Sequence, residues 1–217
     1  MSRYIYLHGF ASSPQSAKAQ YLCRRFAEVG IHLITPELNL GDFSQLSLTR
    51  QLTQVEQLKM EEPVMLIGSS FGGLTAAWLA QRQILPVSRL VLLAPAFQFL
   101  AHWLPQLGAE NLARWQQQGY WSVYHYGNQC EELLSYNFIR DLEQYADAEL
   151  TIPIPTLILH GRGDQVIPIS SSREYAAERS WVKLVELESD HSLANVMEEI
   201  WQAIGDFAQI SSEKLTH

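Results

Sequence analysis

A serine placed between two glycines follows an apolar segment in the first third of the chain. Residues 63–67 are apolar and predict a buried strand, and the alanine-rich residues after the glycines predict a helix. Ser70 has glycine two positions away on either side, at Gly68 and Gly72, whereas Ser69 does not. A strand, the pattern G-x-S-x-G and a helix make a tight turn that strains the serine backbone and exposes its hydroxyl. The pattern predicts Ser70 as a nucleophile, although an ordinary glycine-rich turn would look the same locally.

A nucleophilic serine needs a base, and the chain has 7 histidines. His191 is the candidate because it closely follows the last predicted strand, at residues 182–187. Imidazole changes its charge near neutral pH, so it can accept the hydroxyl proton and later return it. The other histidines are expected to lie inside a strand (His32), in an irregular region (His102, His125), under an acidic loop (His160), in the C-terminal tail (His217) and after the first strand (His8).

The acid that would orient this histidine is Asp164, which follows the predicted strand at residues 155–160. Its carboxylate would accept a hydrogen bond from His191 Nδ1 and stabilise the imidazolium. Gly161 and Gly163 indicate a tight loop, in which an aspartate could also be a simple turn residue. Asp190 is adjacent to the histidine in sequence but is expected to point elsewhere, and Glu186 and Glu188 are weaker candidates still.

An oxyanion hole needs two backbone N–H groups directed at the developing negative charge. One is expected from Phe71, which follows the nucleophile at the positive end of the helix. The other is expected from Phe10, in the loop after the first strand. Gly9 would let the backbone turn there, and His8 would brace the loop by hydrogen bonds. The two phenylalanine side chains are expected to wall the acyl pocket.

Strands and helices alternate along most of the chain. Strands are predicted at residues 3–7, 31–35, 63–67, 89–94, 155–160 and 182–187, and helices at about 16–29, 46–59, 71–84, 170–179 and 192–210. This alternation predicts an α/β fold, a three-layer α/β/α sandwich with a mostly parallel sheet. The candidate residues all follow strands, so they should meet at the carboxyl edge of the sheet. Residues 1–217 are expected to form a single domain, with a frayed polar tail after Ser211.

Regular alternation is lost between about residues 96 and 150, which are rich in aromatic side chains. We expect short helices there, a hairpin turning at Gly127-Asn128, and a helix from Asn137 to Tyr145. This cap insertion (residues 96–150) would either form a lid that gives the substrate pocket Trp103, Trp121 and Tyr124, or be the core of a small subdomain.

Bulk properties exclude several classes of function. The formal net charge of -8 argues against a nucleic-acid partner, which would require a basic face. The 2 cysteines, Cys23 and Cys130, form neither a disulfide framework nor a metal site. No leader and no apolar segment long enough to span a bilayer is found, so the cytoplasm is the expected location.

These motifs resemble those of the α/β-hydrolase superfamily, whose members carry Ser, Asp and His in this chain order. More narrowly, the chain resembles small bacterial esterases of the YqiA/YcfP type, in a trimmed form of the fold. The likeness rests on His8-Gly9-Phe10-Ala11-Ser12-Ser13-Pro14-Gln15-Ser16-Ala17-Lys18, on Gly68-Ser69-Ser70-Phe71-Gly72-Gly73 and on Asp190-His191. The resemblance implies an esterase of short acyl esters, with Ser70, Asp164 and His191 as its triad and Phe10 and Phe71 as its oxyanion donors.

The expected function is hydrolysis of a small carboxylic ester through an acyl-enzyme, without a metal or organic cofactor. The expected partner is a small-molecule ester. A thioesterase or a carbon–carbon bond hydrolase with the same triad is the alternative among enzymes. Outside enzymes, the alternative is a hydrolase-like protein that binds a small ligand without cleaving it. An intact set of Ser70, Asp164 and His191 argues against that last possibility.

Overall fold

Six parallel strands form the central sheet, in the order β2-β1-β3-β4-β7-β8. The structure, a computed structural model, describes residues 3–210, so the predicted frayed tail after Ser211 lies outside the described residues. The strands are β1 (Arg3–Leu7), β2 (Leu33–Ile34), β3 (Val64–Ser69), β4 (Val87–Leu93), β7 (Thr156–Gly161) and β8 (Val182–Leu187). The central strands are apolar over most of their length because helices cover both faces of the sheet.

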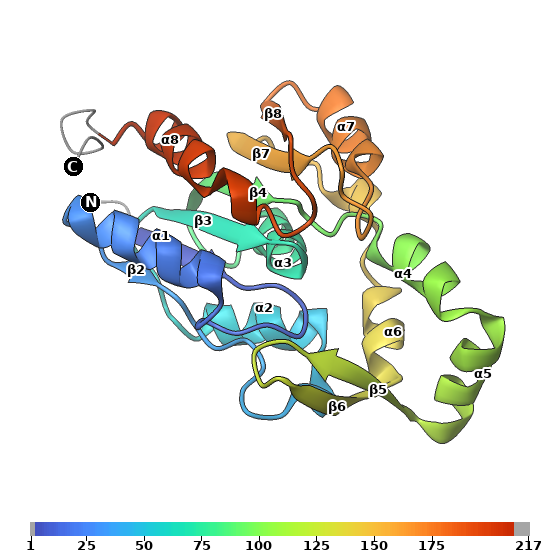
Figure 1. Cartoon of the computed structure of the whole chain (residues 1–217). Helices are drawn as coiled ribbons and strands as arrows, with labels where there is room; N and C mark the ends of the chain where they lie inside the picture. Colours follow the sequence, from blue (N-terminus) through green and yellow to red (C-terminus); the bar gives the residue numbers. More distant parts are fainter. Residues whose placement is uncertain (1–2, 211–217) are drawn as a thin grey trace.

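Helices cover the sheet on both sides, which confirms the predicted three-layer sandwich (Figure 1). One face carries α1 (Ala17–Glu28) and α8 (Met197–Ala208), and the other carries α2 (Leu48–Glu56), α3 (Phe71–Gln81) and α7 (Ile169–Ala177). Two separate apolar clusters fill the spaces between the layers, one on each face of the sheet. Among residues 3–210 no helix combines the length and the apolar character that crossing a bilayer requires.

Several predicted elements are shorter than the sequence pattern indicated, and the helix expected from Asn137 to Tyr145 ends at Leu142. Strand β2 pairs with β1 only through Leu33 and Ile34, so His32 precedes the strand and does not lie inside it. The predicted helix at 46–59 is α2, preceded by the 3-10 helix η1 (Phe43–Gln45). The C-terminal helix begins at Met197 after the 3-10 helix η3 (Ala194–Val196), because Leu193 adopts a left-handed conformation with φ 55°. This conformation leaves His191 in a loop.

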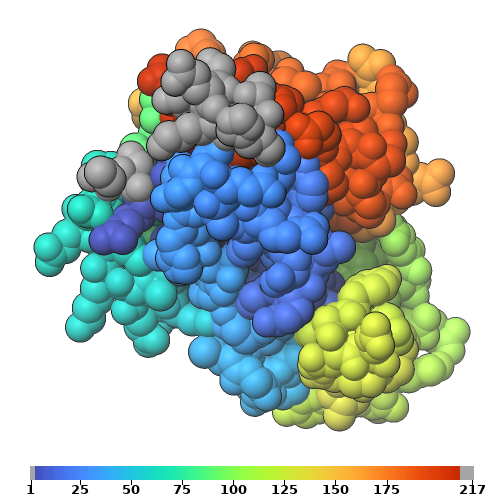
Figure 2. Space-filling view, turned by 60° about the vertical axis from the view of Figure 1, so that its left-hand side comes forward, coloured from blue at the N-terminus to red at the C-terminus, as the bar shows by residue number. Residues whose placement is uncertain are grey.

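The cap insertion lies beyond the carboxyl edge of the sheet (Figure 1). It contains α4 (Phe99–Leu107), α5 (Ala109–Gln118), β5 (Tyr120–His125), β6 (Cys130–Ser135), α6 (Asn137–Leu142) and the 3-10 helix η2 (Asp147–Glu149). Strands β5 and β6 are antiparallel and turn at residues 126–129, which confirms the predicted hairpin. The hairpin meets the N-terminal segment (Figure 2), where Tyr126 N–H donates to the Ala11 carbonyl at 2.8 Å.

Two glycines let α3 approach β1 and β3 at backbone contact. A Cβ atom on Gly72 would lie 2.1 Å from the Leu7 carbonyl oxygen, and one on Gly68 would lie 2.2 Å from the Gly72 carbonyl oxygen. Backbone atoms cannot move aside as a flexible side chain can, so only glycine fits at either position. The sequence pattern and the packing therefore agree on why these two glycines flank Ser70.

Gly72→Ala should be far more destabilising than a glycine substitution at a site with free space. Gly119 is the matched control, because it is left-handed, with φ +81° and ψ -19°, and a Cβ added there would meet nothing within 4 Å. We expect Gly72→Ala to lower the free energy of unfolding by about 3 kcal/mol or more through overpacking, and Gly119→Ala by about 1 kcal/mol through its left-handed backbone. Urea unfolding of both variants measures this. Equal losses would show that the close approach at Gly72 is not rigid.

Candidate active site

The ends of four strands lie side by side and bring the predicted site residues together. Leu7 of β1 is in register with Gly68 of β3, and Gly161 of β7 is in register with Leu187 of β8. The segments that follow these strands therefore leave the same edge of the sheet. They carry His8, Ser70, Asp164 and His191 respectively, as the order of elements predicted.

Ser70 adopts the strained backbone conformation that the glycine pattern predicted. Its φ of 54° and ψ of -117° lie in a region that residues with a side chain rarely occupy. Such a conformation costs about 1–3 kcal/mol and persists only where its surroundings hold it. Here the Ser70 N–H donates to the Leu93 carbonyl at 2.8 Å, and the Ser70 carbonyl accepts from Ala96 N–H at 3.0 Å and Gly73 N–H at 2.9 Å. The turn therefore holds the hydroxyl at the edge of the sheet.

A continuous line of hydrogen bonds joins the serine, the histidine and the aspartate. His191 Nε2 lies 3.0 Å from Ser70 Oγ, and His191 Nδ1 lies 2.7 Å from Asp164 Oδ2. An ionised carboxylate only accepts hydrogen bonds, so Nδ1 carries the proton and Nε2 is free to accept the hydroxyl proton. The Asp164 side chain is fully shielded, whereas that of His191 is 22% exposed, so solvent and ligands reach this line from the histidine side.

Asp164 is held as a carboxylate by four hydrogen bonds. Oδ1 accepts from the N–H groups of Val166 and Ile167, each at 2.9 Å. Oδ2 accepts from His191 and from His160 Nε2, the latter at 3.1 Å. Burial raises the pKa of Asp164, but the hydrogen bonds from His160 and His191 outweigh it and hold that pKa well below its usual range. A fixed negative charge therefore lies behind His191.

His160 supports the aspartate from below, where the sequence placed it. It is completely buried at the end of β7, and its Nε2 also lies 3.0 Å from the Ile167 carbonyl. Both neighbours of Nε2 are acceptors, so Nε2 carries the proton. Nδ1 then accepts the hydroxyl proton of Ser172 at 2.8 Å. His160 thus adds a second imidazole hydrogen bond to Asp164.

Two backbone N–H groups beside Ser70 have no acceptor among the described residues. They belong to Phe71, the first residue of α3, and to Phe10. A Cβ on Gly9 would lie 3.3 Å from both Ser70 Cβ and the Ser69 carbonyl, so the segment before Phe10 runs directly against the serine. Gly9 was expected to permit a turn. Instead it permits this close approach, and the left-handed residue of the loop is Ala11, with φ 48°.

His8 fixes the start of the same loop. Its Nε2 accepts from Leu38 N–H at 3.0 Å, so Nδ1 carries the proton and donates to the Gly9 carbonyl at 3.0 Å. The ring is 1% exposed, which leaves it no contact with substrate. The geometry gives His8 the bracing role expected from the sequence.

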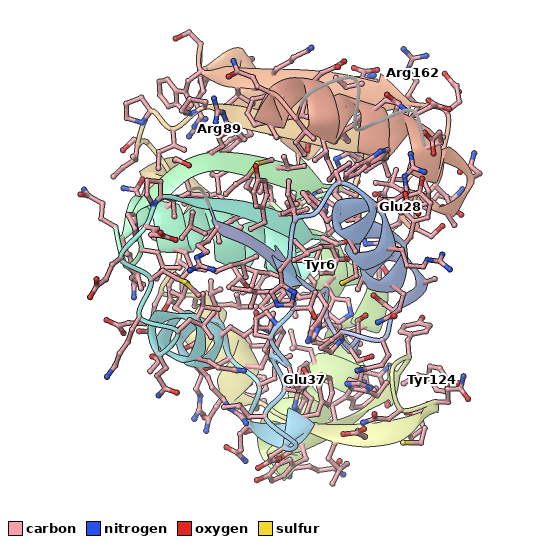
Figure 3. All side chains as sticks on the ribbon, turned by 90° about the vertical axis from the view of Figure 1, so that its left-hand side faces the viewer. Tyr6, Glu28, Glu37, Arg89, Tyr124 and Arg162 are labelled. Carbon is pink, nitrogen blue, oxygen red and sulfur yellow. The ribbon has the colours of Figure 1, made fainter. Side chains whose placement is uncertain are left out.

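The aromatic residues expected at the pocket lie at different distances from the serine turn. Trp103 packs on Phe10, with ring centroids 5.4 Å apart. Trp121 is partly buried and packs against the larger of the two apolar clusters. Tyr124 is 45% exposed on the outer face of the hairpin, where its ring contacts Tyr126 (Figure 3). Phe10 contacts the ring of Phe71, the other phenylalanine expected at the pocket wall. It also contacts three rings that the sequence did not single out, those of Phe43, Phe99 and Phe138.

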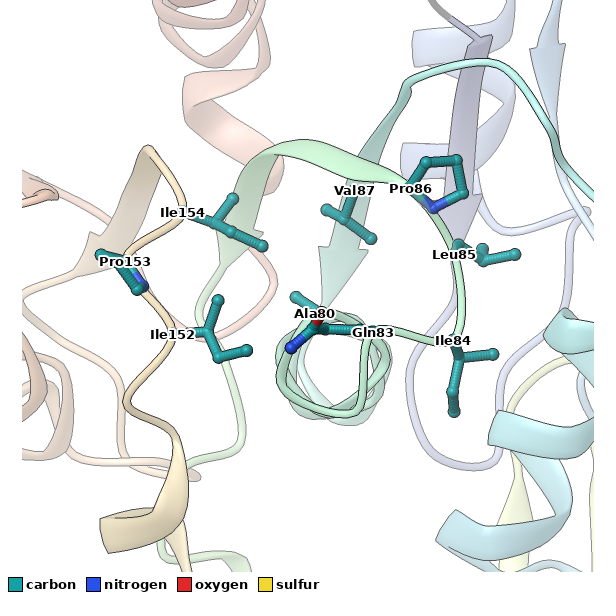
Figure 4. A pocket seen from close by; sticks show the side chains of 9 residues that line it. All are labelled: Ala80, Gln83, Ile84, Leu85, Pro86, Val87, Ile152, Pro153 and Ile154. Carbon is teal, nitrogen blue, oxygen red and sulfur yellow. The ribbon is translucent and has the colours of Figure 1, made fainter.

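A cavity of about 620 Å³ lies at the opposite end of the sheet (Figure 4). It is lined by the end of α3, the residues that lead into β4 and those that lead into β7. Ser70 stands at the other end of β3 and α3, so this cavity is separate from the candidate site. Among residues 3–210 no three or more His, Cys, Asp or Glu side chains are grouped to hold a metal ion.

Comparisons with known proteins agree with this fold. The profile of the family described as Uncharacterised protein family (UPF0227) matches residues 3–209. A putative hydrolase from Agrobacterium vitis S4 overlays with a TM-score of 0.82 at 24% identity, and the match covers 95% of this chain and 87% of that one. Mouse alpha/beta hydrolase domain-containing protein 10 overlays with a TM-score of 0.80 at 20% identity, and the match covers 95% of this chain and 89% of that one. Est1E from Butyrivibrio proteoclasticus, with ferulic acid bound, overlays with a TM-score of 0.79 at 19% identity, and the match covers 100% of this chain and 90% of that one. These likenesses establish the α/β-hydrolase fold.

The low pKa of Asp164 predicts how the stability of the protein depends on pH. A carboxyl whose pKa is depressed by folding stabilises the folded state above its unfolded pKa of about 3.9, and this contribution is lost as the pH falls below that value. The difference in unfolding free energy between the wild type and Asp164→Asn should therefore shrink steadily as the pH falls from about 5 toward 3. Urea unfolding at several pH values measures this difference. A difference that does not change with pH would contradict a depressed pKa.

Proposed function

The chain belongs to the Uncharacterised protein family UPF0227, and on that footing we propose that it is a serine hydrolase that cleaves small carboxylic esters. The observation that carries the proposal is the line from Ser70 Oγ through His191 to Asp164, with contacts of 3.0 and 2.7 Å. Nucleophile, base and orienting acid are thus already within hydrogen-bonding reach of one another.

The reaction begins with attack of Ser70 Oγ on the ester carbonyl carbon. The hydroxyl proton passes to His191 Nε2, and the carbonyl electrons move onto oxygen to form a tetrahedral oxyanion. When this intermediate collapses, the alkoxide leaves, takes the proton from His191, and departs as the alcohol. Water then attacks the acyl-Ser70 with the same histidine as base, which releases the carboxylic acid and restores the hydroxyl.

The surrounding groups lower the barriers of both steps. The Phe10 and Phe71 N–H groups have no acceptor among residues 3–210, so they can donate to the oxyanion without first breaking a hydrogen bond there. The Asp164 carboxylate keeps the proton on Nδ1 of His191 and stabilises the imidazolium once it forms. This mechanism needs neither a metal nor an organic cofactor.

The cap insertion is the part of the single domain that we assign to substrate selection. Helix α4 brings Phe99 and Trp103 against the Phe10 ring, so the substrate would meet an aromatic wall beside the oxyanion donors. Such a wall favours an apolar or aryl group on the ester. The ferulic acid bound to Est1E is an aryl acid, which makes aryl esters a natural class to test. The free thiols of Cys23 and Cys130 suit a reducing compartment, and we place the protein in the cytoplasm.

Labelling with a fluorophosphonate probe tests the nucleophile directly. The probe phosphonylates a serine only when a base removes the hydroxyl proton, so the wild type should take up one equivalent and Ser70→Ala none. Ser69→Ala is the matched control, because it removes the adjacent hydroxyl and should still be labelled to one equivalent. Mass spectrometry of the intact chain and of its peptides gives the stoichiometry and the site. Labelling that survives Ser70→Ala would overturn the assignment.

A panel of chromogenic substrates tests the substrate class. It should contain alkyl esters of increasing acyl length, aryl-acid esters and the matching thioesters. We expect ester cleavage to exceed thioester cleavage, with aryl or medium-length acyl groups preferred, because the wall beside Phe10 is aromatic. A preference for thioesters would identify a thioesterase with the same triad. If no substrate in the panel is cleaved but the probe still labels Ser70, the enzyme cleaves a bond other than these esters and thioesters. If no substrate is cleaved and the probe does not label, the protein binds a ligand without cleaving it.

A further inference from the structure

A lysine ammonium lies against the residue that precedes the nucleophile. Lys18 is the second residue of α1, and its Nζ donates to Ser69 Oγ at 2.9 Å. Ser69 ends β3 and is only 7% exposed. Its side chain faces α1 and α8, as those of Met65 and Ile67 on the same strand do. The contact joins residues 51 positions apart in the sequence, on the side of the sheet opposite α3.

Ser69 also connects this ammonium to the first strand. The Tyr6 hydroxyl, in the interior of the sheet layer (Figure 3), is within hydrogen-bonding reach of the side chains of Ser69 and Ser16. Ser16 caps α1 by accepting from the Ala19 N–H at 3.4 Å. Lys18 can only donate to Ser69, so the Ser69 proton is free for Tyr6. The beginning of α1, directly after the Phe10 loop, is therefore tied to both β1 and the serine turn.

The charged neighbours of Lys18 belong to the candidate active site. The carboxylates close enough to act on it are Asp164, from the loop after β7, and Asp190, from the loop after β8. Burial lowers the pKa of Lys18 to about 8, and the two aspartates oppose this shift. Burial also raises the pKa of the Tyr6 phenol, which therefore carries no charge near neutral pH. At pH 7 the amine is therefore mostly an ammonium beside Asp164.

Two simpler roles do not account for this arrangement. An ammonium that already has two carboxylates nearby is a poor binding site for an anionic substrate group, because those charges repel it. Stability alone does not require charges here, since replacing a buried ion pair by well-packed apolar side chains is often neutral or stabilising. The position of the charge, next to the acid that orients His191, is what remains to be explained.

We propose that Lys18 is a positioning residue of the catalytic centre, which ties the serine turn to the Phe10 side of the oxyanion hole and places a positive charge behind Asp164. The inference rests on the proposed hydrolase function. Through Ser69 it holds the Ser70 turn and the start of α1 in one frame, so the two oxyanion donors keep their spacing. Its charge offsets part of the charge of Asp164, which makes protonation of His191 less favourable and keeps the free base available at lower pH.

Three substitutions separate the tie from the charge. Lys18→Met removes both the positive charge and the hydrogen bond to Ser69, and its side chain is about as long as the aliphatic part of lysine. Ser69→Ala removes the hydrogen bond and keeps the ammonium. Lys18→Arg keeps a positive charge. The rate of fluorophosphonate labelling at Ser70 is measured from pH 5 to 9, because it reports the nucleophile without needing the natural substrate. Lys183→Met on β8 is the control, because that lysine is exposed and outside the site.

Lys18→Met should slow labelling at pH 7 by about 10- to 100-fold, since small displacements of a reacting group cost that much. The midpoint of its acidic limb should also rise by about half a pH unit or more, because a nearby positive charge is gone. Ser69→Ala should slow labelling at every pH without moving the midpoint, and Lys18→Arg should keep the midpoint of the wild type. Lys183→Met should change neither quantity.

Thermal unfolding and a nuclear magnetic resonance titration of the His191 ring complete the test. The labelling rates are compared well below the melting temperature of each variant, because removing a positive charge near a buried carboxylate destabilises the fold. The titration midpoint of the His191 ring should rise in Lys18→Met by the same amount as the labelling midpoint, whether or not the protein turns over an ester. Unchanged midpoints, or a loss of rate that only follows a loss of melting temperature, would overturn the proposal. Absence of labelling in the wild type would overturn the hydrolase function instead, and the ring titration would still decide the role of Lys18.

Discussion

The close approach of α3 to strands β1 and β3 is the constraint on which the candidate site depends. The Gly72 backbone lies against the Leu7 carbonyl, and Gly68 lies against Gly72, with no room for a Cβ at either glycine. This contact sets the pitch of the turn that holds Ser70 at φ 54°. It also places the N-terminal end of α3 beside the last residue of β1, and the Phe71 N–H there has no acceptor among the described residues. The position of this proposed oxyanion donor therefore follows from backbone packing.

Around that rigid turn, the hydrogen-bond partners of the polar groups fix which atom carries each proton. Asp164 is a carboxylate because four donors converge on it, and its two histidine neighbours then each place a proton on the nitrogen that faces it. Ser70 is left as the one partner of His191 Nε2 among the described residues. Buried polar networks are costly when partly satisfied, and this one is satisfied at every member named here. These hydrogen bonds explain how the Asp164 carboxylate stays charged at the edge of the sheet with little loss of folding free energy.

Much of this arrangement could be predicted because it depends on local chemistry and on chain order. Ser70, Asp164 and His191 follow strands of a parallel sheet, and parallel strands bring their carboxyl ends together without any knowledge of side-chain contacts. What could not be predicted depends on contacts distant in sequence. Strand β2 is short because it pairs with β1 at only two positions. Glycine is needed at position 9 because its backbone lies so close to Ser70 that a side chain would crowd the serine. Lys18 stood within a recognisable motif, but only the structure shows that it reaches Ser69.

The cap insertion has a second consequence for the site, besides its aromatic wall. The tip of the β5–β6 hairpin donates the Tyr126 N–H to the Ala11 carbonyl, and Asn39 donates to the Ser12 carbonyl while its amide also contacts His125 of the hairpin. Ala11 has φ 48°, a conformation that a residue with a Cβ keeps only when its surroundings hold it. Since Ala11 directly follows Phe10, the hairpin helps to hold an oxyanion donor in place. A change in the insertion that selects a different substrate would therefore also act on the geometry of catalysis.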